Sequence, residues 1–426
     1  MFALSANGVL GGLLDAHLDG LAQAEDLDAK TIRHGVGQGT MVLLANPAHQ
    51  GVAPTLVGRP AGIKVNANLG TSPFVNDADQ ELGKLDVARA AGADTVMDLS
   101  TGGDLDAIRR AMIKATPLPL GTVPVYAATA RRIALGKDPA SFSAAELMDE
   151  IGRQAEQGVD FMTVHCGVTD RAAALACEGG RVMGVVSRGG AVMIRHMERY
   201  AVENPLLTRY DELLDMALAH NVTLSLGDGM RPGAGADAGD PAQWEEVTVL
   251  AECTRRARER GVQVMIEGPG HVPLDQVEAQ IKGIKRMTLG APLYVLGPLT
   301  TDAAPGHDHI AGAIGGALAA MHGADFLCYL TPAEHLTLPG GQDVYQGVIA
   351  SRIAARSAEV ALGRPSAVQA DLAMSEARAA LDWNAMAGVA LDPPAVRHRR
   401  KEFQDREECA MCGEFCAVKM LRDLER

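Results

Sequence analysis

The sequence of 426 residues is poor in aromatic side chains, which make up 4% of it, and its charge is unbalanced toward acid. It has 39 Lys and Arg against 53 Asp and Glu, for a formal net charge of −14. Proteins that bind nucleic-acid polymers need a basic surface for phosphates, and those that bind single strands also need aromatic rings on which bases stack. The composition therefore argues against a nucleic-acid-binding protein.

Long apolar runs are also missing. No uncharged apolar stretch reaches the ~18 residues that a transmembrane helix requires. The first seven residues contain no basic side chain, and the apolar stretch at 9–14 is interrupted by Gly11 and Gly12, which is not the pattern of a secretory signal. We therefore expect no membrane span and a cytoplasmic location.

Cysteine is scarce and unevenly placed, with seven in the chain and three of them in the last eighteen residues. This is not the pattern of a disulfide scaffold. In a reducing compartment such thiols serve as metal ligands or as small buried side chains. We expect Cys177, Cys253 and Cys328 to lie in the core, and Cys166, which follows His165, to line a functional site.

Apolar residues, by contrast, make up 47% of the chain, enough for a large core. From residue 64 onward, short β-branched runs alternate with alanine-rich helical stretches, which predicts βαβ units and a parallel sheet. The candidate strands are residues 64–69, 95–99, 121–126, 160–166, 184–187, 222–226, 262–267, 293–297 and 325–330.

Nine candidates are one too many for an eight-stranded barrel. The run at 184–187 is the shortest and follows its predecessor after only a brief helix. Without it, most strands begin about 30 to 40 residues after the one before, which suits a (β/α)8 barrel. We predict an α/β fold with this TIM-type barrel over residues 61–362, although a doubly wound open sheet gives a similar pattern.

The segments that flank the predicted barrel differ from it in pattern. Residues 1–60 form an N-terminal lead-in, with an amphipathic helix at 13–27 and a glycine-rich break at 35–39. Residues 363–426 form a C-terminal region, with a helix at 365–383 and a chain break at Asp392-Pro-Pro394. The charged tail that follows is too polar for a core of its own, so we expect an arm that folds around a cofactor or a partner subunit.

Polar or flexible residues follow nearly every candidate strand. A lone Asn or His after a strand is usually a turn or cap residue. Because the carboxyl ends of all barrel strands meet on one face, however, eight such clusters in register predict an active site there. The clusters are residues 66–68, 98–100, Tyr126, 165–167, 187–190, 228–231, 267–271 and 331–335.

The tail carries the motif Cys409-Ala-Met-Cys412-Gly-Glu-Phe-Cys416. Each iron of a [4Fe–4S] cluster takes one thiolate, so three ligands leave one iron open. An open iron can chelate a small molecule, as in radical S-adenosylmethionine (SAM) enzymes. A structural zinc knuckle that borrows a histidine is the alternative that this spacing also allows.

Two histidines, His271 in Gly-Pro-Gly-His and His335 in Pro-Ala-Glu-His, suggest a second metal site. Imidazoles suit Zn, Fe or similar divalent ions, and two protein ligands leave positions open for water or substrate. His309, next to Asp308, is a rival for this role or for a supporting one.

Taken in order, these motifs resemble the ThiC family of phosphomethylpyrimidine synthases. The resemblance covers about residues 60–360 and the cysteine tail. The stretches that carry it are residues 65–72, 97–104, 121–126, 161–167, 187–190, 225–233, 267–273, 294–299, 308–310 and 325–335.

The resemblance implies a radical SAM carbon–carbon lyase with a (β/α)8 barrel and a C-terminal cluster arm. It implies a homodimer in which the arm reaches the neighbouring active site, and an external one-electron donor. The substrate would be 5-aminoimidazole ribonucleotide and the product 4-amino-5-hydroxymethyl-2-methylpyrimidine phosphate, a thiamine precursor.

Roles carry over motif by motif. Cys409, Cys412 and Cys416 would hold the [4Fe–4S] cluster, and His271 and His335 would hold one divalent metal, Zn or Fe. Glu267, His165 and Tyr126 would be catalytic. The substrate contacts would be Asn68, Met97, Tyr126, His165, Ser187, Arg188, Gly189, Asp228, Gly229, Met230, Arg231, Glu267 and Tyr294.

This sequence departs from the family pattern in places. Three residues separate Cys412 from Cys416 where many members have four, His307 stands where tyrosine is common, and residues 1–46 are not recognisable. The 5-hydroxybenzimidazole synthases share these motifs and this nucleotide substrate, so the product stays open. A zinc-dependent barrel hydrolase or lyase and a catalytically inactive relative are more distant alternatives.

Overall fold

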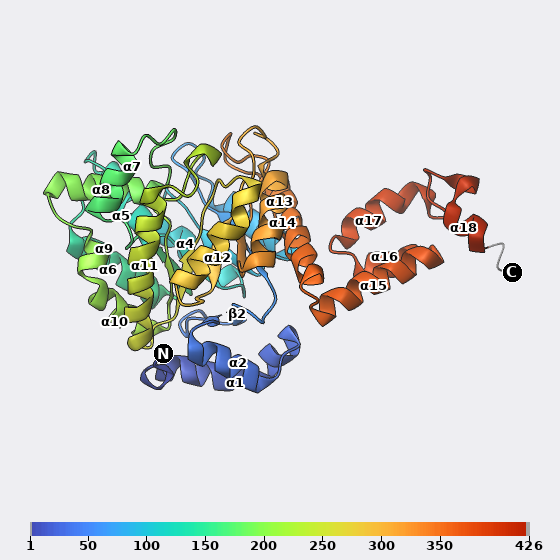
Figure 1. Ribbon diagram of the computed structural model, residues 1–426, viewed down its shortest axis with the longest axis horizontal. Coiled ribbons are helices and arrows are strands. Elements are labelled where there is room, and N and C mark those ends of the chain that lie inside the picture. Colours follow the sequence, from blue (N-terminus) through green and yellow to red (C-terminus); the bar gives the residue numbers. More distant parts are fainter. Residues whose placement is uncertain (1, 423–426) are drawn as a thin grey trace. The chain divides into compact units, whose positions relative to one another are not determined.

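The computed structural model describes residues 2–422 (Figure 1). The chain divides into two compact units at Ala355 and Arg356, and each is described by itself. Within residues 2–422, no helix combines the length and the apolar character that crossing a membrane requires.

The first unit is built around eight parallel strands that close into a barrel in the order β10-β3-β4-β5-β6-β7-β8-β9. The predicted (β/α)8 fold is therefore confirmed, and residues 184–187 form no strand. The barrel strands are β3 (Lys64–Leu69), β4 (Thr95–Asp98), β5 (Leu120–Thr122), β6 (Phe161–Val164), β7 (Thr223–Leu226), β8 (Val264–Glu267), β9 (Leu293–Leu296) and β10 (Phe326–Cys328).

One predicted strand is too long. The candidate at 121–126 ends at Thr122, because Pro124 begins a helix there. Proline is favoured in the first turn of a helix, where its missing N–H is not needed. Tyr126 therefore lies on a helix and not on the strand before it.

Helices surround the barrel (Figure 1). They are α3 (Ala78–Ala91), α4 (Leu105–Ala115), α5 (Pro124–Ala134), α6 (Ala144–Gln157), α7 (Asp170–Glu178), α8 (Arg188–Tyr200), α9 (Pro205–Thr208), α10 (Tyr210–His220), α11 (Pro241–Glu259), α12 (Val277–Met287), α13 (Asp308–His322) and α14 (Gly341–Ala361). Helix α6 shows how the sequence sets the start, the buried face and the end of such a helix. Ser143 and Glu146 form a capping box at its start, and Leu147 and Ile151 lie on its buried face. Gly158 ends the helix in a left-handed conformation.

Aromatic side chains fill the interior of the barrel. The Phe326 ring stacks on Tyr294 with 4.3 Å between ring centroids and meets Phe161 edge-on at 6.2 Å. Gly121 makes room for this packing, because a Cβ there would lie 2.2 Å from the Phe161 ring. The barrel is thus a solid core on which the strand ends are held rigidly.

The N-terminal segment covers the amino-terminal end of the barrel. It comprises α1 (Gly8–Glu25), α2 (Ala29–Gln38) and the antiparallel pair β1 (Val42–Leu44) and β2 (Thr55–Val57), and its helices are blue in Figure 1. The Leu43 N–H donates to Gln263 Oε1 at 2.7 Å, and the Asn46 N–H donates to Asp160 Oδ1 at 2.7 Å. Gln263 and Asp160 directly precede β8 and β6. These two hydrogen bonds therefore attach the N-terminal segment to the amino-terminal end of the barrel.

One prediction about this segment needs correction, and one of its elements was not predicted. The glycine-rich break at 35–39 is wrong, because α2 continues through it and ends only at Gly39, which has a φ of 68°. Ile32 and Val36 of this helix are buried in the apolar cluster of the N-terminal segment, and this packing stabilises the helix despite its glycines. The β1–β2 pair was not predicted at all, since its strands are only three residues long.

The second unit is helical, with α15 (Pro365–Ala380), α16 (Trp383–Val389), α17 (Pro393–Arg400) and α18 (Ala417–Arg422). The helix predicted at 365–383 ends at Ala380, and Asp382 caps the next one. The chain break predicted at 392–394 is wrong. The Asp392 carboxylate accepts the Ala395 N–H at 3.0 Å, so Asp392 and the two prolines begin α17.

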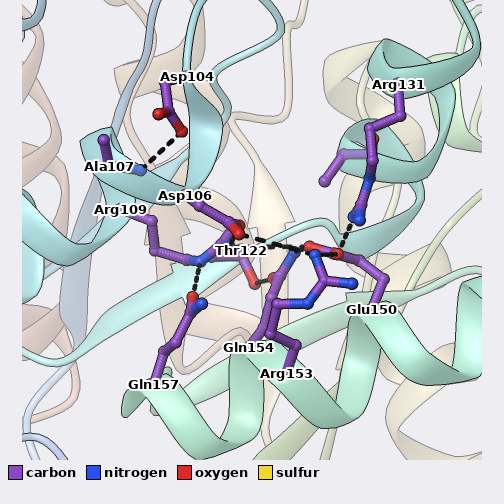
Figure 2. A network of polar contacts seen from close by, with 11 residues as sticks. Asp104, Asp106, Ala107, Arg109, Thr122, Arg131, Glu150, Arg153, Gln154 and Gln157 are labelled. Carbon is purple, nitrogen blue, oxygen red and sulfur yellow. Dashed lines mark hydrogen bonds and ion pairs between the residues drawn. The ribbon is translucent and has the colours of Figure 1, made fainter.

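A buried polar network joins α4, α5 and α6 on the outside of the barrel (Figure 2). The Glu150 carboxylate is fully buried and forms ion pairs with Arg131, with Arg153 at 3.0 Å and with Arg109 at 3.7 Å. Arg109 is itself 2% exposed. Charges at this depth are tolerated because they are paired and hydrogen-bonded.

Removing Glu150 should therefore destabilise the first unit strongly. We expect Glu150→Ala to lower the free energy of unfolding by about 3–5 kcal/mol, because it leaves the buried Arg109 guanidinium short of negative charge. Urea denaturation followed by circular dichroism measures this. Asp211→Asn, which breaks an exposed ion pair with Arg256, should change stability little, and equal losses in the two variants would contradict the interpretation.

Candidate active site

A cavity with an empty volume of about 500 Å³ lies at the carboxyl ends of the barrel strands. The structure brings eight of the thirteen predicted substrate residues together in its wall. They are Asn68, Met97, Tyr126, His165, Asp228, Arg231, Glu267 and Tyr294. These residues are spread over 227 positions of sequence, and the barrel closure alone unites them.

Glu267, at the end of β8, is held by two hydroxyl groups, one from the adjacent strand β7 and one from β6 beyond it. Thr163 Oγ1 donates to Glu267 Oε1 at 2.6 Å, and Ser225 Oγ donates to the same oxygen at 2.7 Å. Burial raises the pKa of this carboxyl above its ordinary value, and the two hydrogen bonds oppose that shift. The carboxyl is thus fixed in place by two residues that lie within the family motifs but were not predicted as site residues.

Asn66 organises the opposite wall. Its Nδ2 donates to the Tyr294 hydroxyl and to Asn68 Oδ1, both at 2.8 Å, while Thr95 Oγ1 donates to its Oδ1 at 2.7 Å. Asn68 Nδ2 in turn donates to Cys328 Sγ at 3.0 Å. Every polar group of Asn66 is therefore used to orient its neighbours, and Asn66 itself does not line the cavity.

Arg231 is the one residue in the cavity wall with a permanent positive charge. Its Nη1 donates to Asp228 Oδ1 at 2.9 Å. Burial raises the pKa of Asp228 to about 8, although Arg231 favours the ionised form, and the nearby Glu267 adds to the rise. The cavity therefore presents one guanidinium beside carboxyl groups that hold protons unusually tightly.

His165 is neutral in this setting. Burial, with a smaller contribution from Arg231, lowers its pKa to about 3. Its Nε2 lies 3.3 Å from Ser187 Oγ, and its Nδ1 has no hydrogen-bond partner among the residues that the structure describes. A neutral imidazole with a free nitrogen can donate or accept a hydrogen bond.

The predicted segment 187–189 is not part of the cavity wall, but its residues contact His165 and Tyr126, which are. Ser187 caps α8 by accepting the Gly190 N–H at 3.1 Å. A Cβ at Gly189 would lie 2.1 Å from His165 Cε1, so only glycine allows the imidazole this position. The Arg188 guanidinium lies 4.7 Å from the centroid of the Tyr126 ring.

His271 and His335 lie side by side, with 5.4 Å between their ring centroids. Asp302 Oδ1 is 2.7 Å from His271 Nδ1, and Asp308 Oδ1 is 3.5 Å from His335 Nδ1. Carboxylates placed behind imidazoles in this way orient metal-ligating histidines. His335 also has a φ of 61°, in the left-handed region that residues other than glycine adopt uncommonly.

Within residues 2–422, no three His, Cys, Asp or Glu side chains are already placed to hold a single metal ion. The histidine pair supplies two imidazole groups, so a metal held there would need water or substrate in its other positions. Asp308 and not His309 supports the pair: the buried Nδ1 of His309 has no partner among the described residues.

Two cysteines, Cys166 and Cys177, differ from their predicted roles. Cys166 is buried against Cys253 and does not line the cavity. Cys328 is buried, as predicted, and it also lines the cavity because it ends a barrel strand. Cys177 is exposed, because α7 buries only its alanine face.

Cys409, Cys412 and Cys416 lie in the second unit. Backbone N–H groups of Cys412 and Met411 lower the pKa of the Cys409 thiol, and the contact with Cys409 raises the pKa of Cys412. The thiols are thus close to one another, and Cys409 favours the thiolate that iron requires. A [4Fe–4S] cluster takes each thiolate on a different iron, so the three ligands need not share one point.

The segment before Cys409 is anchored by two side chains. Trp383 Nε1 donates to the Glu407 carbonyl at 2.8 Å, and Arg400 Nη2 donates to the Arg406 carbonyl at 2.7 Å. The Arg400 guanidinium lies 4.0 Å from the centroid of the Trp383 ring. The anchor therefore consists of the Arg400–Trp383 cation–π pair, and each of its two side chains also donates a hydrogen bond to a backbone carbonyl group.

The sequence matches the model of the radical SAM ThiC family over residues 7–423. The chain belongs to this family. Its resemblance to ThiC proteins is thereby confirmed, and membership implies a [4Fe–4S] cluster and SAM. It also removes the zinc-dependent hydrolase from consideration.

Relatives cover nearly the whole chain. The phosphomethylpyrimidine synthase of Syntrophus aciditrophicus (strain SB) is 49% identical over 94% of each chain, and that of Methanopyrus kandleri is 50% identical over 95% of each. Among solved structures, a dihydropteroate synthase from Coxiella burnetii matches with a TM-score of 0.41 and 13% identity, covering 72% of this chain and 96% of its own. A structural likeness at this level carries no argument about function.

The hydrogen bonds to Glu267 generate a prediction. We expect Ser225→Ala to raise the pKa of Glu267 further, because the Ser225 hydroxyl stabilises the ionised carboxylate. Titration of carboxyl carbons by NMR measures this, with Glu267→Gln used to assign the signal. An unchanged or lowered pKa in Ser225→Ala would show that the hydroxyl does not stabilise the charge.

Proposed function

We propose that this chain is a phosphomethylpyrimidine synthase, a radical SAM lyase that converts 5-aminoimidazole ribonucleotide to 4-amino-5-hydroxymethyl-2-methylpyrimidine phosphate. The observation that carries the proposal is the match to synthases of this name at 46–50% identity over at least 94% of the chain. The proposal includes a cytoplasmic location, a homodimer and an external one-electron donor.

In this proposal the substrate phosphate is bound near Arg231, the cation in the cavity wall. A guanidinium binds phosphate oxygens with charge-assisted hydrogen bonds. Ser187, Arg188 and Gly189 add a further cation and the start of α8, where backbone N–H groups favour anions. The turn formed by Asp228, Gly229 and Met230 would present Arg231 to the phosphate.

The remaining contacts would bind the ribose and the aminoimidazole. Asn68 and His165 offer hydrogen-bonding groups for hydroxyl or amino groups, and Met97, Tyr126 and Tyr294 form the walls on either side. Because His165 is neutral, it recognises such groups without repelling the Arg231 guanidinium.

We assign proton transfer to Glu267, His165 and Tyr126. Glu267 Oε1 is taken by Thr163 and Ser225, so Oε2 is the oxygen that remains to exchange a proton with the substrate. Burial raises the pKa of Glu267, which makes it able to hold and release a proton nearer to neutral pH. His165 Nδ1 and the Tyr126 hydroxyl would hold or move protons on the other side.

Cys409, Cys412 and Cys416 would hold the [4Fe–4S] cluster, leaving one iron for SAM. When bound, the cluster and SAM supply the one-electron chemistry that breaks and rearranges the nucleotide. His271 and His335 would hold one divalent ion, Zn or Fe, with Asp302 and Asp308 behind them. Zn and Fe both accept imidazole ligands.

The direct test of the activity is product analysis. The protein is reconstituted anaerobically with iron and sulfide and given 5-aminoimidazole ribonucleotide, SAM and a one-electron reductant. We expect the pyrimidine phosphate by mass spectrometry, its loss in Cys412→Ala, and its retention in Cys177→Ala, which removes an exposed cysteine elsewhere. 5-Hydroxybenzimidazole instead of the pyrimidine, or no product from protein that contains the cluster, would overturn the proposal.

A second test concerns the divalent metal. We expect Asp302→Asn to weaken metal binding about 10–100-fold, because the Asp302 carboxylate orients the His271 ring through Nδ1. Competition with a chelator, followed by elemental analysis, measures the affinity. Asp275→Asn changes an exposed carboxylate nearby and should have no effect, so equal affinities in both variants would argue against the histidine site.

A further inference from the structure

One buried carboxyl group beside the cavity has no part in the roles assigned above. Glu246 comes from α11 and is 2% exposed. Its Oε2 accepts the Met230 N–H at 2.8 Å, and its Oε1 has no hydrogen-bond partner among the described residues. The side chain thus extends from the outer helix layer to the turn that carries Arg231.

The space for Glu246 is created by two glycines in successive strand-end loops. A Cβ at Gly167 would lie 2.7 Å from Glu246 Cγ, and a Cβ at Gly229 would lie 3.2 Å from Glu246 Oε1. The Cβ at Gly167 would meet Leu250 at the same distance, and the Cβ at Gly229 would lie still closer to Val168, at 2.3 Å. The loops after β6 and β7 therefore pack closely against Glu246 and its neighbours.

The anchored turn is a short one. The Arg231 N–H donates to the Asp228 carbonyl at 3.1 Å, and the Arg231 side chain folds back to Asp228 Oδ1. The Met230 side chain is fully buried. The bond from the Met230 N–H to Glu246 ties the middle of this turn to α11, so the direction of the Arg231 side chain depends on it.

We propose that Glu246 is a positioning residue, which accepts the Met230 N–H and thereby fixes the turn at 228–231 so that Arg231 meets the phosphate of the substrate. The proposal rests on the proposed function, because that function supplies the phosphate. Glu246 does not line the main cavity and touches no substrate in this role.

The electrostatic setting shows which property of Glu246 matters. Burial, and secondly the nearby Asp228, raise the pKa of Glu246 well above its ordinary value, while Arg231 opposes the rise. Burial therefore favours the protonated form, and the geometry shows the carboxyl group acting as a hydrogen-bond acceptor for the Met230 N–H. Glutamine, whose side chain has the same shape and also ends in a carbonyl oxygen, should replace it.

The test compares Glu246→Ala, Glu246→Gln and Thr254→Ala. Thr254 is also fully buried on α11, but its hydroxyl bonds only to the Leu250 carbonyl of its own helix. Isothermal titration calorimetry measures the affinity of the reconstituted enzyme for 5-aminoimidazole ribonucleotide, under anaerobic conditions and without SAM. The midpoint of thermal unfolding is recorded for each variant.

We expect Glu246→Ala to bind the nucleotide about tenfold more weakly or worse, because the buried Met230 N–H loses its acceptor and the turn moves. Glu246→Gln should stay within about twofold of the wild-type affinity, and so should Thr254→Ala. Rescue by glutamine is a result that mere loss of buried volume does not explain.

Three results would overturn the proposal: wild-type affinity in Glu246→Ala, a loss in Glu246→Gln as large as in Glu246→Ala, or an equal loss in Thr254→Ala, which would indicate general loosening of α11. A wild-type enzyme that does not bind the nucleotide would instead refute the proposed function. The two failures are therefore distinguishable.

Discussion

The closure of eight parallel strands into a barrel is the constraint on which the rest of the structure depends. Closure makes every strand end at the same rim, and it places Asn68 from β3 beside Cys328 from β10 although 260 positions separate them. The aromatic rings inside the barrel then prevent the rim from collapsing inward. Side chains at the rim have little freedom, so hydrogen bonds between neighbouring strands set their orientation.

The chemistry of the cavity follows from an imbalance of charge within this rim. The carboxyl groups of Asp228, Glu246 and Glu267 are buried around the single guanidinium of Arg231, and burial raises the pKa of all three. One cation does not balance three buried carboxylates, so this setting favours the protonated forms of the acids. An anionic substrate would meet less negative charge in the proposed site than the number of carboxyl groups implies.

The sequence was informative where function depends on strand ends and uninformative where it depends on distant packing. The strand at 64–69 was located to the residue, and the polar clusters at the rim were read from their positions after strands. Asp302 and Glu246 were missed, because a loop acid and a helix acid show no local signal of the backbone or imidazole that they contact. Cys166 was misplaced for a similar reason, because the residues around it give no local signal of its contact with Cys253 on α11.

The close approach of the α8 start to the turn after β7 also limits how this site can vary. A methyl group at Gly190 would lie 2.5 Å from the Gly229 carbonyl oxygen, and one at Gly229 would lie 2.3 Å from Val168 Cγ2. Even alanine is excluded at both positions, whatever reaction the cavity supports. If these glycines are invariant among relatives, the cause would be this close backbone packing and not the reaction. A change of substrate during evolution would then have to begin with substitutions of the side chains at the rim.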